Sequence, residues 1–219
     1  MNAHVEVYDA EELPAVAASV VDGLLPRDGS VVITGGETAE AVYPELARAG
    51  GDWSGVDVFF SDERCVPPDH PASNYGMAKR TLLEAVTPRR VHRMRGEIDP
   101  QEAAAIYDEL VVDAFEIAVL GLGEDAHVAG LFPGSPGLLE AASCVVVDRP
   151  DGLQGLSLTP PALLSAKWIV FVVSGPSKAE AVRRALAADE DVMACPVAMF
   201  RDHPSVTFLL DRAAASSWG

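Results

Sequence analysis

The chain has few basic residues and little cysteine, and it lacks any long apolar run. Its 219 residues include 16 Lys and Arg against 33 Asp and Glu, which gives a formal net charge of −17 at pH 7. A surface with this excess of negative charge repels polyphosphates and anionic lipids, so we expect neither nucleic acid nor a membrane as a partner. If the ligand is itself an anion, the few basic residues must be gathered where it binds.

The cysteines and the first residues exclude further classes of protein. Cys65, Cys144 and Cys195 are odd in number and widely spaced, so neither a disulfide framework nor a zinc site is predicted. The opening MNAHVEVYDAEEL lacks the basic and apolar regions of a secretory signal. No stretch approaches the roughly 18 uninterrupted apolar residues of a membrane span. These absences predict a cytoplasmic protein.

Apolar, β-rich runs alternate with Ala-rich helical segments along the whole chain, and no linker or internal repeat is visible. Several of the runs are apolar at consecutive positions, which is typical of parallel strands covered on both faces. We therefore expect one α/β domain over residues 1–219, with three layers and a mostly parallel, modified Rossmann-like sheet. The predicted strands are 5–8, 31–34, 56–61, 115–121, 168–174 and 206–211. The predicted helices are 10–25, 38–49, 74–86, 100–113 and 176–187, with Asn74 as an N-cap and Pro176 in a first turn.

In open parallel sheets, ligands bind beyond the carboxyl ends of the strands, and three loops there are unusual. The first loop is TGGET, between the strand 31–34 and a helix. Gly35 and Gly36 allow close backbone approach, and the helix N-terminus offers free N–H groups, which together suit a phosphate. Glu37 counts against an anion unless it points away, and a Gly-Gly turn is otherwise a simple chain reversal.

The second loop is SDERCVPPDHPASN, which follows the strand 56–61. Asp62, Glu63 and Arg64 concentrate opposite charges where a parallel strand delivers its functional residues. Arg64 can bind a phosphate bidentately while one carboxylate holds its guanidinium. The simpler interpretation is a surface ion pair, with Asn74 as a helix cap.

The third loop is GLGEDAHVAGLFPG, at the end of the strand 115–121. His127 lies two residues after Asp125, an arrangement that suits a general base with a carboxylate to orient it. A histidine here can also be a structural hydrogen-bonding group. The G-x-G in this loop lacks the third glycine of a dinucleotide-binding site.

Five segments in one order resemble a known family. TGGETA resembles an SGGSTP phosphate loop, SDERCVPPDHPASN resembles DERxVP…H…SN, and GLGEDAHVAGLFPGSP resembles GxGxDGHxASLFPGxP. VHRMRGEIDPQEAAAIY occupies the place of the family's weakly patterned stretch, and SGPSKAEAV resembles GxxKAxAV. The sequence thus resembles the 6-phosphogluconolactonases, within the glucosamine-6-phosphate deaminase and ribose-phosphate isomerase-like fold group.

The resemblance implies hydrolysis of 6-phospho-D-glucono-1,5-lactone, a small-molecule sugar-phosphate lactone of the pentose phosphate pathway, without metal or organic cofactor. By position, His127 is then the general base for water and Asp125 its polar partner. The remaining site residues bind substrate. The phosphate rests on Gly35, Gly36 and Thr38 with the countercharges Arg64 and Lys178, and the sugar lies against Asp62 and Asn74.

Four positions depart from the family pattern. Ala126 replaces a glycine, Val128 replaces a frequent hydroxyl residue, and Glu37 stands where a small hydroxyl residue is usual. The basic residue of the family's RVTLT segment aligns with Gly155. The loss of that charge-assisted hydrogen bond, worth about 1.5–3 kcal/mol, would weaken phosphate affinity by roughly one to two orders of magnitude.

Three alternatives to a 6-phosphogluconolactonase remain open. The first is a sugar-phosphate deaminase or isomerase, but Phe132 stands where the resembling deaminases have a carboxylate. The second is a non-catalytic sugar-phosphate-binding protein that retains the scaffold. The third is a lactonase for a non-phosphorylated or differently charged substrate.

Overall fold

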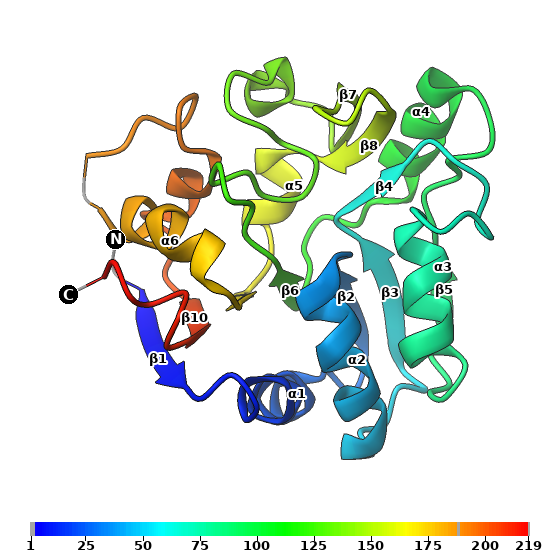
Figure 1. The fold of residues 1–219 in the computed structure, drawn as a ribbon. Coiled ribbons are helices and arrows are strands. Elements are labelled where there is room, and N and C mark those ends of the chain that lie inside the picture. Colours follow the sequence, from blue (N-terminus) through cyan, green and yellow to red (C-terminus); the bar gives the residue numbers. More distant parts are fainter. Residues whose placement is uncertain (1–2, 188, 219) are drawn as a thin grey trace.

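A seven-stranded parallel sheet forms the centre of the computed structural model, which describes residues 3–187 and 189–218. The strands lie in the order β1-β10-β9-β6-β2-β3-β5 (Figure 1). They are β1 (His4–Tyr8), β2 (Gly29–Ile33), β3 (Val56–Phe60), β5 (Arg90–His92), β6 (Ile117–Leu120), β9 (Trp168–Val173) and β10 (Val206–Asp211). Within the described residues, no helix is long and apolar enough to cross a membrane.

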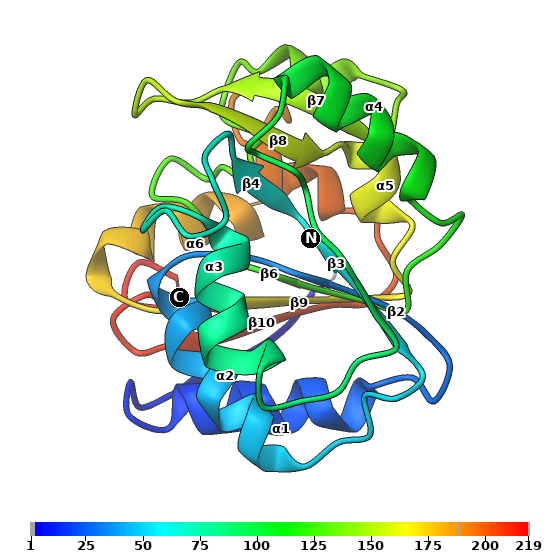
Figure 2. The ribbon, with the colours of Figure 1, turned by 90° about the vertical axis from the view of Figure 1, so that its right-hand side faces the viewer.

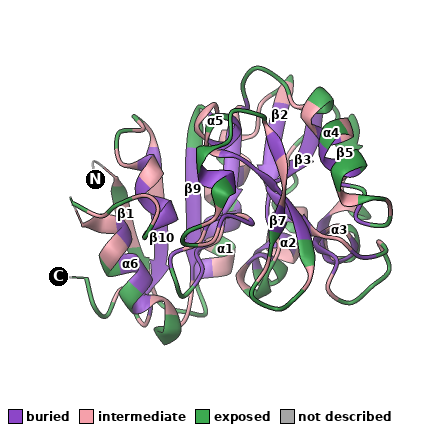
Figure 3. Cartoon of the chain, turned by 90° about the horizontal axis from the view of Figure 1, so that it is seen from above, coloured by how far each residue is buried: buried purple, intermediate pink, exposed green. Residues whose placement is uncertain are grey.

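Helices cover both faces of this sheet, which confirms the predicted three-layer α/β fold. One face carries α1 (Leu13–Leu24), α2 (Glu37–Ala49) and α3 (Asn74–Ala78). The other carries α4 (Pro100–Leu110), α5 (Pro160–Leu164) and α6 (Ala179–Leu186) (Figure 2). Alternate residues of each central strand enter the two cores, so the strands are buried on both faces (Figure 3). This double burial explains their continuous apolar sequences.

A second sheet of three antiparallel strands lies above the first and was not among the predicted elements. It consists of β4 (Asp62–Arg64), β8 (Gln154–Leu158) and β7 (Cys144–Asp148), in that order. β4 follows β3 after Ser61 alone, so the chain passes directly from the parallel sheet into the antiparallel one. β4 is short and highly charged, and it gives no strand signal of its own.

Two predicted helices are less regular than expected. Only residues 74–78 of the segment 74–86 are α-helical, and a π-helical turn (Lys79–Leu83) follows them. The segment 176–187 begins with a 3₁₀ turn (Pro176–Lys178), with Pro176 in its first turn as predicted, before α6. The prediction of Asn74 as the N-cap is wrong. Ser73 is the cap, because its Oγ accepts a hydrogen bond from Gly76 N at 3.0 Å.

The buried carboxylate of Glu63 joins β4 to the start of α3. It accepts hydrogen bonds from the backbone N–H groups of Arg64, Asn74 and Tyr75 at 2.7–2.8 Å and from Ser73 Oγ at 2.9 Å. Burial raises the pKa of Glu63, and these hydrogen bonds oppose the rise. The contacts fix Arg64 and Asn74 relative to each other.

We predict that Glu63→Gln lowers the free energy of unfolding by about 1–3 kcal/mol, because an amide NH₂ would face buried N–H donors. Urea unfolding at neutral pH measures the change. The control is Glu97→Gln, which removes a partner of the partly exposed Arg93 ion pair and should cost less than about 1 kcal/mol. Equal effects in the two variants would contradict a special role for Glu63.

Candidate active site

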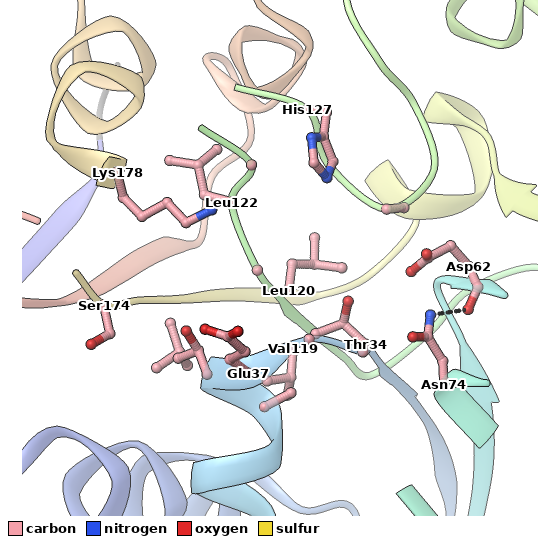
Figure 4. A pocket seen from close by; sticks show the side chains of 18 of the residues that line it. Thr34, Glu37, Asp62, Asn74, Val119, Leu120, Leu122, His127, Ser174 and Lys178 are labelled. Carbon is pink, nitrogen blue, oxygen red and sulfur yellow. Dashed lines mark hydrogen bonds between the residues drawn. The ribbon is translucent and has the colours of Figure 1, made fainter. Parts of the chain in front are cut away.

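A cavity of about 430 Å³ opens at the carboxyl ends of the central strands. The neighbouring strands β9, β6 and β2 each end in a loop that lines it, and β4 and α3 close one side (Figure 4). The three loops singled out in the sequence therefore converge. A volume of this size suits a small metabolite.

The cavity brings together every predicted site residue except Asp125. These residues are Gly35, Gly36, Thr38, Asp62, Arg64, Asn74, His127 and Lys178. Asp125 lies behind the imidazole of His127 and contacts it from outside the cavity lining. Among residues 3–187 and 189–218, no group of three or more His, Cys, Asp or Glu side chains is placed to hold a metal ion.

The Gly-Gly loop is held in place by the buried Tyr43 of α2. The hydroxyl of Tyr43 accepts a hydrogen bond from Thr34 N at 3.0 Å and donates one to Thr34 O at 2.5 Å. Gly36 has a φ of +97°, which favours glycine, and a Cβ at Gly35 would overlap the side chain of Asn74. Both glycines are therefore required by local geometry.

Glu37 is the first residue of α2 and lines the same cavity. Its carboxylate lies near the cavity floor and does not turn away from it (Figure 4). A negative charge at this position offsets part of the positive potential of the helix N-terminus. The N-terminus of α2 therefore attracts an anion less strongly than it would with a hydroxyl residue at position 37.

Arg64 and Asn74 form one wall of the cavity together with Asp62. Arg64 donates a hydrogen bond from Nη1 to Asn74 Oδ1, and Asn74 Nδ2 donates to the carbonyl of Asp62 at 2.9 Å. Ser61 Oγ donates to Asp62 Oδ1 at 2.9 Å. The surface ion pair considered for Arg64 does not form among the described residues, so its guanidinium keeps donors for a ligand.

The imidazole of His127 is oriented by Asp125. Its Nδ1 lies 2.6 Å from Asp125 Oδ1, which also accepts the backbone N–H of His127 at 3.1 Å. Burial raises the pKa of Asp125, but the hydrogen bonds from His127 outweigh this and hold it below its usual range. An ionised carboxylate only accepts hydrogen bonds, so Nδ1 carries a proton. In the neutral form of the ring, the lone pair is then on Nε2. The ring projects into the cavity (Figure 4).

The backbone around His127 is tightly folded. Ala126 is buried with a φ of +69°, a conformation that costs a non-glycine residue about 1 kcal/mol and explains why a glycine is usual there. Gly123 N donates a hydrogen bond to His127 O at 2.9 Å. The ring of Phe132 packs against the imidazole at a centroid distance of 4.4 Å. These contacts restrict the ring to one position.

Lys178 comes from the opposite end of the cavity, in the turn before α6. The turn is fixed by Asp211, which accepts hydrogen bonds from Ser174 Oγ at 2.6 Å and Gly175 N at 2.8 Å. The side chain of Lys178 extends toward Leu122 across the cavity (Figure 4).

Sequence reasoning missed Arg149, which also lines the cavity. It follows β7 in a polar turn that has no ligand-binding pattern. Only the pairing of β7 with β8 brings it to the site, and that pairing is not visible in the local sequence.

Comparisons with known proteins show what the whole chain is similar to. A family model described as glucosamine-6-phosphate isomerases/6-phosphogluconolactonase matches residues 12–209. A 6-phosphogluconolactonase from Synechocystis is 32% identical in an alignment that covers 94% of this chain and 91% of the relative. One from Streptomyces coelicolor is 34% identical in an alignment that covers 96% of this chain and 92% of the relative. The structure of a 6-phosphogluconolactonase from Trypanosoma brucei has the same fold, with a TM-score of 0.90, 22% identity, and coverage of 100% of this chain and 99% of that one.

We predict that Gly123→Ala disturbs the Asp125–His127 hydrogen bond, because the added Cβ would overlap the imidazole. The matched control is Gly121→Ala, where a Cβ has no atom within 4 Å. Nitrogen-15 NMR of the imidazole reports which ring nitrogen is protonated. Wild type and Gly121→Ala should show the Nδ1–H form, and Gly123→Ala should lose it. A wild type in which Nε2 and not Nδ1 carries the proton would contradict the assignment, and an unchanged tautomer in Gly123→Ala would contradict the predicted overlap.

Proposed function

Because the chain belongs to the family of glucosamine-6-phosphate isomerases and 6-phosphogluconolactonases, we propose that it hydrolyses 6-phospho-D-glucono-1,5-lactone to 6-phosphogluconate. The observation that carries the proposal is the oriented imidazole of His127 facing a cavity that also presents Arg64 and Lys178. A strained ester needs a base for water and cations for the phosphate, which supports His127 as the base and Arg64 and Lys178 as the cations.

In this mechanism, Nε2 of His127 accepts a proton from a water molecule as its oxygen adds to the lactone carbonyl. The carbonyl carbon becomes tetrahedral, and its bond to the ring oxygen then breaks. The imidazolium returns the proton to that oxygen, which gives the open-chain acid with a free hydroxyl group. Asp125 is a positioning residue that stabilises the imidazolium between these two transfers.

The phosphate binds to Gly35, Gly36 and Thr38 at the start of α2, with Arg64 and Lys178 as countercharges. Asp62 and Asn74 contact the sugar hydroxyl groups. Support comes from the common cavity that these residues line. The excess acidic charge and the three free thiols of the chain fit a cytoplasmic enzyme of small molecules that does not bind nucleic acid.

The deaminase alternative requires a carboxylate near the base for ring opening and proton transfer. Phe132 occupies the corresponding place, and its ring packs on His127. An apolar ring cannot carry a proton, so this contact favours hydrolysis over deamination.

We predict that His127→Asn lowers kcat for freshly generated phosphogluconolactone by roughly 10²–10⁴-fold, because the amide cannot act as a base. Disappearance of the lactone is measured against the spontaneous rate. Binding of 6-phosphogluconate should change little, which separates lost chemistry from lost folding. Wild-type protein that binds this product but does not exceed the spontaneous rate would instead indicate a binding protein.

We predict that Arg64→Ala raises KM more than it lowers kcat, because Arg64 contributes ground-state binding of the phosphate. Steady-state kinetics with the phosphorylated lactone test this. Arg183→Ala is the control, because Arg183 forms an exposed ion pair with Glu180 and is not among the cavity-lining residues. A fall in kcat with unchanged KM would show that Arg64 acts in the transition state.

A further inference from the structure

We propose that Arg149 is a phosphate-binding residue of this site and that it supplies the cation missing at position 155. The identity of the phosphorylated ligand rests on the proposed function. The assignment of Arg149 rests on its own contacts and on the space that Gly155 leaves free.

Arg149 closes the β7–β8 hairpin, where its backbone N–H donates to Leu153 O at 3.1 Å. A hairpin end is usually exposed, but the side chain of Arg149 is only 9% exposed and lines the cavity. Nε donates a hydrogen bond to Asp151 Oδ2 at 3.2 Å, and Nη1 lies 3.8 Å from Asp62 Oδ2. Neither Nη atom has an acceptor within hydrogen-bond distance among the residues that the structure describes. The guanidinium therefore retains donors for a ligand.

An aromatic contact places this guanidinium near the reaction centre. Its Cζ lies 5.5 Å from the ring centroid of Phe132, and the same ring lies 4.4 Å from the imidazole of His127. Phe132 thus separates the cation from the base while it packs against both. A substrate held by Arg149 would lie within the reach of His127 without an ion pair between the two side chains.

The absence of a side chain at Gly155 leaves room for Arg149. A Cβ at Gly155 would lie 3.0 Å from Cδ of Arg149 and 3.0 Å from the carbonyl oxygen of Glu63. A longer side chain at 155 and the observed path of Arg149 therefore compete for the same space. Gly155 is also the register partner of Arg64 in β4, so the stem of Arg149 passes over the position that pairs with Arg64.

Two guanidinium groups on one wall repel each other and favour a dianion between them. Asp62 and Asp151 offset part of this positive charge. At the start of α2, by contrast, Glu37 and Glu40 reduce the attraction of the helix end for an anion. The phosphate is therefore best stabilised where the Gly-Gly loop meets Arg64 and Arg149, since guanidinium groups bind phosphate oxygens in pairs.

The test uses Arg149→Met, which keeps the apolar stem over Phe132 and removes the charge. We expect KM for the phosphorylated lactone to rise about ten- to hundredfold and the affinity for 6-phosphogluconate, measured by calorimetry, to fall by a similar factor. Hydrolysis of unphosphorylated glucono-1,5-lactone should change little. Arg183→Ala should leave all three quantities unchanged. Unchanged affinity for 6-phosphogluconate in Arg149→Met, or equal loss for both lactones, would overturn the assignment.

A second experiment moves the arginine from position 149 to position 155 and tests directly whether side chains at these two positions compete for the same space. Gly155→Arg alone should weaken binding of 6-phosphogluconate by displacing Arg149, whereas Arg149→Ala with Gly155→Arg should bind more tightly than Arg149→Ala alone. A folded double variant with no recovery would contradict the relocation. Wild-type protein that binds 6-phosphogluconate through Arg149 but does not hydrolyse the lactone would overturn the proposed function and leave this inference standing.

Discussion

The parallel alignment of β9, β6 and β2 is the constraint on which the site depends. These neighbouring strands point the same way, so the residues that follow them meet at one edge of the sheet. His127, the Gly-Gly loop and Lys178 are far apart in the sequence and share one cavity for this reason. Without that alignment, each motif would be an ordinary turn on the protein surface.

The antiparallel sheet contributes charged residues to a side of the cavity that the loops of the parallel sheet do not form. β3 runs on into β4, and the carboxylate of Glu63 then fixes the start of α3. This brings Arg64 and Asn74 against the Gly-Gly loop, so tightly that Gly35 can have no side chain. The rigid wall formed in this way also accommodates Arg149 from the adjoining hairpin. The cavity is thus lined by residues from both sheets.

The sequence predicted the parallel sheet and its loops because doubly buried strands have continuous apolar runs and their loops have glycines and charges. β4 was missed because a short, highly charged strand looks like a loop in the sequence. The Ser73 cap was missed because Ser73 and Asn74 are neighbours and both are residue types that cap helices. Arg149 could not be predicted, since only long-range pairing of β7 with β8 brings it to the cavity. The resemblance showed that a basic residue is missing at position 155. Only the three-dimensional packing shows that the side chain of Arg149 occupies the space beside Gly155.

The net negative charge of the protein is compatible with an anionic ligand, because the two act over different distances. Exposed charges more than about 10 Å apart are screened at 0.1 M salt, whereas cations in the cavity act at contact distance. The central claim is that His127 activates water as a general base, and the pH dependence of kcat/KM tests it most directly. After subtraction of the spontaneous rate, kcat/KM of the wild type should rise with the loss of one proton, and this rise should be absent in His127→Asn. A flat wild-type profile, or the same rise in the variant, would contradict the account.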